Sequence, residues 1–342
     1  MKTMNKIGII GAGAWGTALA ATVRRAGCRV TLWAREPEVV AGIRADGRNP
    51  LFLPEVRLDQ VEATADLAAA ADADAVLLVV PAQFLRGACR SLKPLWRPGT
   101  PALICAKGIE TTSCAVMSEV LAEELPMAPV AVLSGPTFAI EVAKGLPTAV
   151  TLACADTALG QRLVEAVGTP SFRPYLTDDV IGTEMGGAVK NVLAIACGVV
   201  EGRGLGDNAR AALITRGLAE LMRLAVAKGA RPSTCMGLSG LGDLILTASS
   251  SQSRNYSLGY ALGQGQSLAE ILAGRRSVAE GVASAASVVG LAARLGVEMP
   301  IAAAVDGLLH RGIGIEQSIG GLLARPFTGE LGFPGLASAP SR

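Results

Sequence analysis

The chain has 342 residues, half of them hydrophobic, and its 31 basic side chains nearly balance its 29 acidic ones. This length is enough for two domains with a large core. The net charge of +2 argues against nucleic acid or an anionic membrane as a partner, because both are bound through a strong excess of positive charge.

The cysteines and the apolar segments argue against two further classes of protein. The seven cysteines are scattered and form no CxxC pair, so neither a disulfide framework nor a zinc site is expected. The apolar run that begins at Ile7 is interrupted by glycines, and the longest uncharged runs are shorter than a membrane-spanning helix. We therefore expect a cytoplasmic protein with no metal and no membrane insertion.

In the first half of the chain, short β-rich runs alternate with helical stretches. A helix is predicted over Gly16–Ala26, and the segment Asp46–Leu58, rich in Pro, Asn and Gly, is predicted to be a loop. Continuous apolar strands separated by helices are typical of a doubly wound parallel sheet. The predicted strands are Lys6–Ile10, Arg29–Trp33, Ala75–Val80, Pro101–Ala106, Val130–Leu133 and Thr148–Ala153.

From Thr177 onward, the strand signals stop and helical patterns take over. Thr177–Asp179 offers N-cap residues for a long helix, and Asp207 and Asn208 do so for a second helix that runs to Lys228. Further helices are predicted at Glu280–Leu295, Ile301–His310 and Glu316–Leu323. The predicted fold is therefore α/β, with a Rossmann-like domain over 1–179, an all-α domain over 180–325 and a flexible tail over 326–342.

The first motif with chemical meaning is Gly11-Ala-Gly13-Ala-Trp-Gly16, which follows a predicted strand and opens a predicted helix. In this context Gly11 permits the tight turn, Gly13 lets a pyrophosphate approach the backbone, and Gly16 allows close packing of helix on strand. The amino end of the helix then favours the phosphates. The motif predicts a nicotinamide dinucleotide as cofactor.

The residues after the second predicted strand bear on the choice between NADP and NAD. Arg35 stands where an arginine accommodates the 2′-phosphate of NADP, while the adjacent Glu36 leaves NAD open, since an acidic residue binds the free ribose hydroxyl. Two solvated loop charges are the alternative.

Two further segments end predicted strands and so point toward the binding crevice of such a sheet. Lys107 follows the strand Pro101–Ala106 and has the reach to bind a phosphate or a carbonyl; an exposed loop lysine is the alternative. In Ser134-Gly-Pro-Thr-Phe138, Gly135 and Thr137 offer an N–H and a hydroxyl to a substrate, unless the segment is a plain turn.

Lys190 is the only charge between Glu184 and Glu201. Its neighbours one helical turn away are glycine, leucine and alanine, none of which pairs with an ammonium group. His310 is the only histidine of the chain, so a partly buried lysine is a reasonable substitute as a proton carrier. The alternative, a lysine on a solvated helix face, fits the apolar surroundings less well.

The last motif runs from Gly240 through Asp243 to Ser253-Arg254-Asn255. Asp243 is interpreted either as a helix cap or as a hydrogen-bonding partner of Lys190 or of a substrate hydroxyl. Arg254 and Asn255 suit a phosphate, because the guanidinium binds it through two parallel N–H groups. A plain surface arginine is the alternative.

Together these motifs resemble the bacterial-type NAD(P)-dependent sn-glycerol-3-phosphate dehydrogenases, from Lys6 to about Leu309. Ala14 departs from the serine that relatives often carry. The stretches that carry the resemblance are GAGAWGTALA, AKGIE, LSGPTFA, GAVKNVLAIACG, NARAALITRGLAEL, GLSGLGDLILT and SRN.

The resemblance implies reversible reduction of dihydroxyacetone phosphate to glycerol 3-phosphate for phospholipid synthesis, by a homodimer, with Lys190 as proton acceptor. It places Lys107, Gly135, Thr137, Lys190, Asp243, Ser253, Arg254 and Asn255 at the substrate. It places Gly11, Gly13, Ala14, Trp15, Gly16, Arg35, Lys107, Ala139, Arg254, Val278 and Glu280 at the cofactor. A related two-domain reductase of β-hydroxyacids or ketoacids and a non-catalytic NAD(P) sensor are the alternatives.

Overall fold

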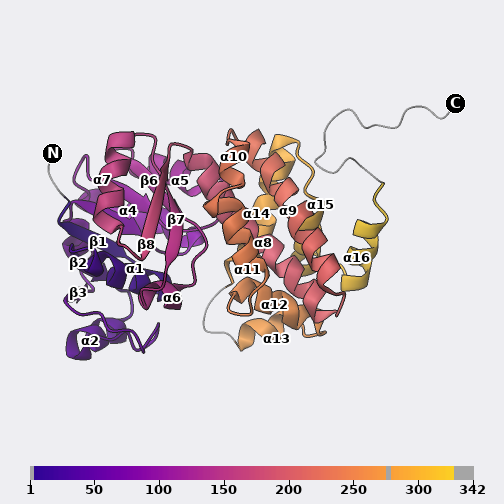
Figure 1. Cartoon of the computed structure of the whole chain (residues 1–342), viewed down its shortest axis with the longest axis horizontal. Coiled ribbons are helices and arrows are strands. Elements are labelled where there is room, and N and C mark those ends of the chain that lie inside the picture. Colours follow the sequence, from indigo (N-terminus) through magenta and orange to yellow (C-terminus); the bar gives the residue numbers. More distant parts are fainter. Residues whose placement is uncertain (1–3, 275–278, 327–342) are drawn as a thin grey trace.

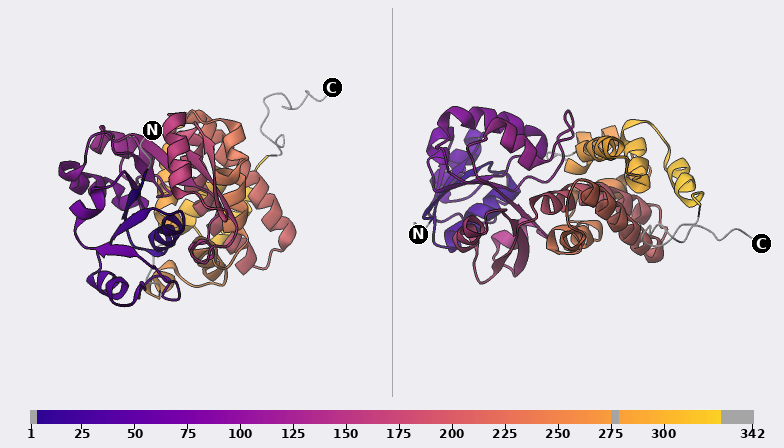
Figure 2. Two further views of the ribbon diagram at one scale, coloured as in Figure 1. Left: turned by 60° about the vertical axis from the view of Figure 1, so that its left-hand side comes forward. Right: turned by 90° about the horizontal axis from the view of Figure 1, so that it is seen from above.

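The computed structural model describes residues 4–274 and 279–326. Two parts of the chain lie side by side, the first built around a sheet and the second from helices (Figure 1). Figure 2 shows the same separation from two other directions. The sheet ends with its last strand at Thr177, and the helical part begins at Val180.

The first part contains an eight-stranded sheet with the order β3-β2-β1-β4-β5-β6-β7-β8. Every neighbouring pair is parallel except β6 and β7. The strand order reverses between β1 and β4, which is where a doubly wound sheet opens a binding crevice. The strands are β1 (Lys6–Ile10), β2 (Arg29–Trp33), β3 (Val61–Thr64), β4 (Ala75–Leu78), β5 (Ala102–Ile104), β6 (Val130–Ser134), β7 (Thr148–Ala153) and β8 (Phe172–Thr177).

The sheet differs from the predicted one at its edges and at one pairing. Sequence reasoning missed β3 and β8, because both are edge strands with exposed side chains such as Glu62 and Arg173 and so lack a continuous apolar run. The predicted doubly wound parallel sheet is confirmed, except that β6 and β7 pair in antiparallel fashion. The connection between β6 and β7 contains only the five-residue helix α6, and no feature of its sequence marks the change of strand direction.

Helices cover both faces of the sheet, so consecutive strand residues are buried in different cores. Ile9 packs in one apolar cluster with Leu19 and Leu32, while Ile10 packs in another with Leu78 and Leu85. The predicted helix after the glycine motif begins two residues earlier than expected. The helices of this part are α1 (Ala14–Arg25), α2 (Pro37–Asp46), α3 (Leu67–Ala71), α4 (Leu85–Leu92), α5 (Met117–Glu124), α6 (Ala139–Ala143) and α7 (Thr157–Val167), with short helices η1 (Ala82–Phe84) and η2 (Lys93–Leu95).

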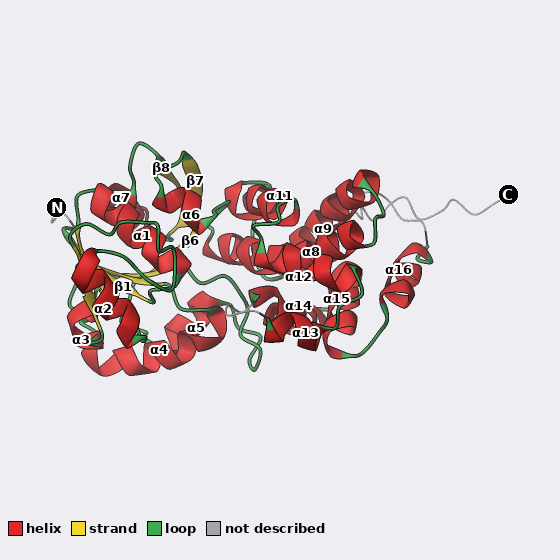
Figure 3. Cartoon of the chain, turned by 90° about the horizontal axis from the view of Figure 1, so that it is seen from below, coloured by secondary structure: helices red, strands yellow, loops and turns green. Residues whose placement is uncertain are grey.

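The second part consists of helices joined by loops, with no strand among its described residues (Figure 3). Asp179 caps its first helix by accepting a hydrogen bond from Gly182, as predicted. The predicted cap of α9 is wrong, since Gly206 holds the cap position and Asp207 is the first helical residue. The helices are α8 (Val180–Gly202), α9 (Asp207–Ala227), α10 (Pro232–Cys235), η3 (Leu238–Gly242), α11 (Asp243–Ala248), α12 (Arg254–Gly263), α13 (Leu268–Ala273), α14 (Glu280–Leu295), α15 (Pro300–His310) and α16 (Ile315–Leu323).

Helix α8 is the centre of this part. By length and composition it is apolar enough to cross a membrane, but 83% of its most apolar window is buried inside the fold, as expected for a core helix. Gly198 and Gly259 let α8 and α12 touch closely, because a methyl group on either would collide with backbone of the other helix. This contact fixes the amino end of α12 beside the middle of α8.

Candidate active site

The glycine turn after β1 has the geometry that a dinucleotide requires. Gly11 has φ of +113°, and a Cβ there would lie 3.0 Å from the backbone of Val79, just beyond β4. A Cβ on Gly16 would collide with the carbonyl of Gly11, whereas Gly13 has open space around it. The backbone is therefore closed on the sheet side and open on the side where a pyrophosphate would lie.

A second observation supports the fit of a ligand at this turn. The indole Nε1 of Trp15, in the first turn of α1, is buried without a hydrogen-bond partner among the described residues. No side chain caps α1 at Gly13, so the amino end of the helix remains available to an anion. Ala14, the predicted departure from the family pattern, is the first residue of this helix and contributes no hydroxyl.

Arg35 lies beyond the end of β2, and its side chain is 78% exposed. Its Nη2 forms an ion pair with Glu36 Oε1 at 2.9 Å. The two residues that sequence analysis weighed against each other for cofactor choice therefore bind one another. An exposed pair of this kind contributes little stability, so Arg35 is easily redirected to a 2′-phosphate.

The centre of the site is a carboxylate that bridges two lysines. Asp243 Oδ1 lies 2.5 Å from Lys190 Nζ, and Oδ2 lies 2.7 Å from Lys107 Nζ. Thr247 Oγ1 accepts a further bond from Lys190 at 2.9 Å, and the carbonyl of Gly135 accepts one from Lys107 at 2.9 Å. Lys107 comes from the sheet part and Asp243 from the helical part, so the cluster joins the two.

The cluster decides between the alternatives left open by sequence analysis. The hydrogen bond of Asp243 with Lys190 is present, whereas Asp243 is no helix cap, because it is the first residue of α11 after Gly242. Lys107 is no exposed loop lysine, since only 12% of its side chain is accessible.

Burial and charge together lower the pKa of Lys190. Desolvation is the main cause; the charge of Lys107 acts in the same direction, while that of Asp243 opposes both, and the pKa falls to about 8. One buried carboxylate facing two ammonium groups leaves one positive charge uncompensated. Burial raises the pKa of Glu280, the first residue of α14, whereas the positive charges of Arg254, Lys190 and Lys107 lower it in part.

Two glycines make room for this arrangement. A Cβ on Gly187, one turn before Lys190, would lie 2.8 Å from Ser134 Oγ and 3.3 Å from Lys107 Cγ. The aliphatic part of the Lys107 side chain therefore packs against α8 at a position that has no side chain. Gly135 has φ of +148°, and a Cβ there would lie 2.9 Å from Val150 Cα. Thr137, two residues on, donates to the carbonyl of Gly135 at 3.2 Å.

The amino end of α12 lies next to the lysine cluster. Ser253 caps this helix by accepting from the amide of Tyr256, and the exposed Arg254 is its first residue. Asn255 donates to Asn191 Oδ1 at 2.9 Å, and its own Oδ1 accepts from the amide of Gly281 at 3.0 Å. The amino end of a helix that carries an arginine is suited to a phosphate. The bond of Asn255 with Asn191 connects the amino end of α12 to the residue after Lys190.

Sequence reasoning assigned no role to two side chains in the cluster. Thr247 bonds both Lys190 and Asp243, and its place one helical turn after Asp243 was the available signal. Ser134 is buried and its hydroxyl has no partner among the described residues, which nothing in the sequence reveals. Of the predicted cofactor contacts, Ala139 is the first residue of α6, and Val278 lies outside the described residues.

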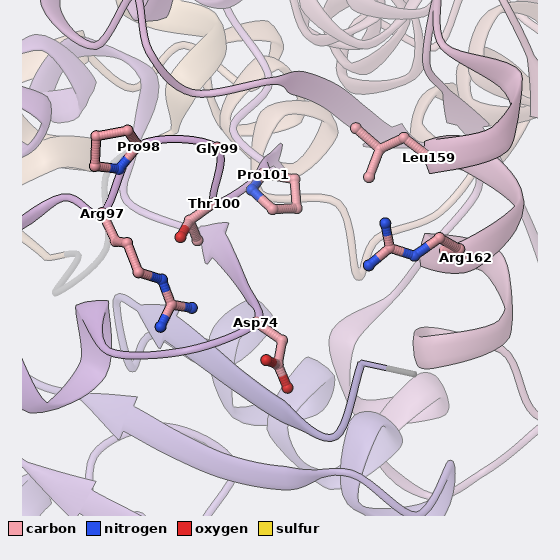
Figure 4. A pocket seen from close by; sticks show the side chains of 8 residues that line it. All are labelled: Asp74, Arg97, Pro98, Gly99, Thr100, Pro101, Leu159 and Arg162. Atoms are coloured by element: carbon pink, nitrogen blue, oxygen red, sulfur yellow. The ribbon is translucent and has the colours of Figure 1, made fainter. Parts of the chain in front are cut away.

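A separate cavity of about 400 Å³ lies at the amino ends of the strands, away from the glycine turn (Figure 4). Asp74 and Pro101 at its rim directly precede β4 and β5, and Arg97 and Arg162 stand on either side of Asp74. It therefore does not belong to the crevice at the carboxyl ends of the strands. Within residues 4–274 and 279–326, no group of three or more His, Cys, Asp or Glu side chains is placed to hold a metal ion.

Comparison with known proteins agrees with this geometry. Family models described as the N-terminus and the C-terminus of NAD-dependent glycerol-3-phosphate dehydrogenase match residues 6–160 and 179–320. The chain is 63% identical to glycerol-3-phosphate dehydrogenase [NAD(P)+] of Rhodospirillum rubrum, covering 96% of this chain and 95% of that protein. The corresponding protein of Caulobacter vibrioides is 58% identical, with coverage of 96% and 99%.

A solved structure shows the same relationship in three dimensions. The crystal structure of glycerol-3-phosphate dehydrogenase from Coxiella burnetii is 40% identical, with a TM-score of 0.90 over 94% of this chain and 99% of that one. The two-part architecture, the glycine turn and the matching family models lead to one conclusion: the chain belongs to the NAD-dependent glycerol-3-phosphate dehydrogenase family.

Proposed function

We propose that the protein reversibly reduces dihydroxyacetone phosphate to sn-glycerol 3-phosphate with NADH or NADPH. The observation that carries this proposal is the bridge from Lys107 through Asp243 to Lys190, a lysine of lowered pKa. The residue after Lys190 is bonded to the first turn of α12, which would bind the phosphate. The close family relationship supports the substrate. Arg254 would also suit the carboxylate of a ketoacid, so the family relationship is what favours the phosphorylated substrate. A mere sensor would not need a buried lysine.

The residues at the glycine turn fit the cofactor. Gly11, Gly13 and Gly16 would hold its pyrophosphate against the start of α1, Trp15 offers a free donor, and Arg35 would bind the adenosine end. Ala14, Lys107, Ala139, Arg254, Val278 and Glu280 are the remaining proposed contacts. When bound, the nicotinamide supplies or accepts a hydride at C2 of the substrate.

Lys190 would move the proton. In the direction of reduction, its ammonium group gives a proton to the oxygen that forms on C2; in the reverse direction, its neutral amine takes the hydroxyl proton. Asp243 and Thr247 hold Nζ in place. Lys107, Gly135 and Thr137 would complete the polar surface around the three-carbon body.

Ser253, Arg254 and Asn255 would anchor the phosphate at the start of α12. Binding energy gained at this remote group orients C2 toward Lys190. Because Lys107 lies in the sheet part and the anchor in the helical part, we propose that the two parts close on the substrate together.

Three further proposals concern the setting of the enzyme. The cysteines of the described chain are all free, which supports a reducing cytoplasm. Exposed apolar side chains on the helical part, among them Val226 and Leu323, support a homodimer. The product, a phosphorylated glycerol, is a fitting precursor for glycerophospholipid synthesis.

The direct test is a steady-state comparison of NADH and NADPH with dihydroxyacetone phosphate and with unphosphorylated dihydroxyacetone. We expect turnover only with the phosphorylated ketone. Equal kcat/KM for both ketones would contradict the proposed anchor, and binding of either cofactor without turnover would overturn the reaction itself.

The pH dependence should differ between the two directions. Because the pKa of Lys190 is lowered to about 8, kcat/KM for reduction should be level below that pH and fall above it, as the ammonium group disappears. For oxidation, kcat/KM should rise through the same region, as the neutral base forms. Rate profiles for both directions, each buffer corrected for ionic strength, would reveal this; parallel profiles would contradict it.

Replacing Arg254 with alanine should raise KM for dihydroxyacetone phosphate by about 10–100-fold, since hydrogen bonds to a charged group are lost. Arg254→Lys keeps the charge but loses the paired N–H geometry, so a partial recovery is expected. An unchanged KM in the alanine variant would remove the phosphate anchor from Arg254.

A further inference from the structure

A second buried carboxyl lies on α8, six residues before Lys190. Glu184 is 5% exposed and takes no part in the proposed chemistry. Its two oxygens accept hydrogen bonds from one residue, Ser118, at 2.7 Å from the amide and 2.5 Å from the hydroxyl. Ser118 belongs to α5, so this contact joins the helical part to the sheet part.

The contact provides what the sequence of α5 lacks. The residue at the N-cap position of α5 is Val116, whose side chain has no acceptor, although the amides of a first helical turn need partners. Glu184, on α8, instead accepts the hydrogen bond of the Ser118 amide and so caps the first turn of α5. Figures 1 and 3 both place α5 on the side of the sheet part that lies toward the helical part.

We infer that Glu184 is a positioning residue, which sets through its bonds to Ser118 how α8 presents Lys190 to Lys107 and Asp243. Six helical residues separate Glu184 from Lys190, about 9 Å along a rigid helix. Asp243 bridges Lys190 and Lys107 across the junction of the two parts, so the bridge depends on how α8 lies against the sheet part. The capping contact and the lysine cluster thus fix the same helix at two points along its length.

The charges near Glu184 allow a specific substitution. The charges of Glu119 and Lys228 act on Glu184 in opposite directions, and these two residues pair with each other at 2.6 Å. Burial raises the pKa of Glu184 to about 7. Its protonated carboxyl would accept from the amide and donate to the hydroxyl of Ser118, and a glutamine reproduces both bonds.

The test compares Glu184→Ala with Glu184→Gln, and it rests on the proposed reaction. In the alanine variant we expect kcat for reduction to fall about 10–100-fold, because α8 moves relative to Lys107 and the sheet part. KM for dihydroxyacetone phosphate should be nearly unchanged, because the phosphate anchor is bonded to α8 and remains intact. The alkaline limb of the pH profile should move upward as Lys190 leaves its buried place beside Lys107. Glutamine should restore both kcat and the limb.

Lys228→Met is the matched control, since it breaks the neighbouring, more exposed contact across the same interface. It should leave kcat and the pH limb unchanged. Should Glu184→Ala fail to accumulate, Ser118→Ala removes one of the two bonds and should give the same changes at smaller size. A lower melting temperature with an unmoved limb and parental kcat would overturn the positioning role, whereas an inactive parent would overturn only the proposed reaction.

Discussion

Replacing Lys190 with methionine should lower kcat by about 10²–10⁴-fold in both directions, the range expected when a general acid–base is removed. Methionine keeps the length and the apolar contacts of the lysine stem in the α8 core. Asp243 retains Lys107 and Thr247 as partners, so the variant should fold. Steady-state rates with dihydroxyacetone phosphate and with glycerol 3-phosphate measure the loss.

A second substitution separates proton transfer from charge. Lys190→Arg keeps a positive charge at this position, but a guanidinium does not give up its proton at any accessible pH. It should therefore be as inactive as the methionine variant in the direction of oxidation. Cofactor binding, followed by the fluorescence of the reduced nicotinamide, should be unaltered in both variants. Parental turnover by the methionine variant would exclude Lys190 as the proton carrier.

The site illustrates what a sequence can and cannot predict. The sequence singles out Lys190 because no neighbour along the helix can pair with its ammonium group. Its partner Asp243 lies 53 residues away. The identity of the participants followed from the motifs. The bond of Asp243 with Lys190 was one of the two interpretations of Asp243. Its bond with Lys107 was not predicted, because these two residues lie 136 residues apart and meet through the packing of two separate parts. No local pattern encodes such a distance.

The fold shows the same division. The central strands were predictable because they are buried on both faces and read as unbroken apolar runs. The edge strands β3 and β8 were not predicted, because some of their polar residues face solvent and interrupt the apolar pattern. The antiparallel direction of β7 was not predictable either, because an apolar strand has the same pattern in both directions. Likewise, the pairing of Arg35 with Glu36 shows why those two residues alone do not settle the cofactor.

Replacing Asp243 with asparagine should have the second large effect, on stability as well as on rate. The amide has nearly the same shape, but it leaves the ammonium groups of Lys107 and Lys190 buried without a counter-charge. Breaking a buried ion pair from one side costs about 3–5 kcal/mol, which urea unfolding at neutral pH would measure. Asp306→Asn is the matched control: this carboxylate is equally buried, but its partner Arg311 is 63% exposed and returns to water.

The direction of the pH effect makes this prediction specific. The charge of Asp243 raises the pKa of Lys190 against burial, so its removal should lower that pKa further below 8. The fall of kcat/KM for reduction, which needs the ammonium form, and its rise for oxidation, which needs the amine, should then both move to lower pH. At pH values below about 8, the folded parent keeps a proton on Lys190 that the folded variant has already lost. The stability deficit should therefore shrink as pH rises toward 8 and stay level above it. A deficit independent of pH, or pH–rate profiles that do not move, would show that Asp243 acts on Lys190 through shape alone and not through its charge.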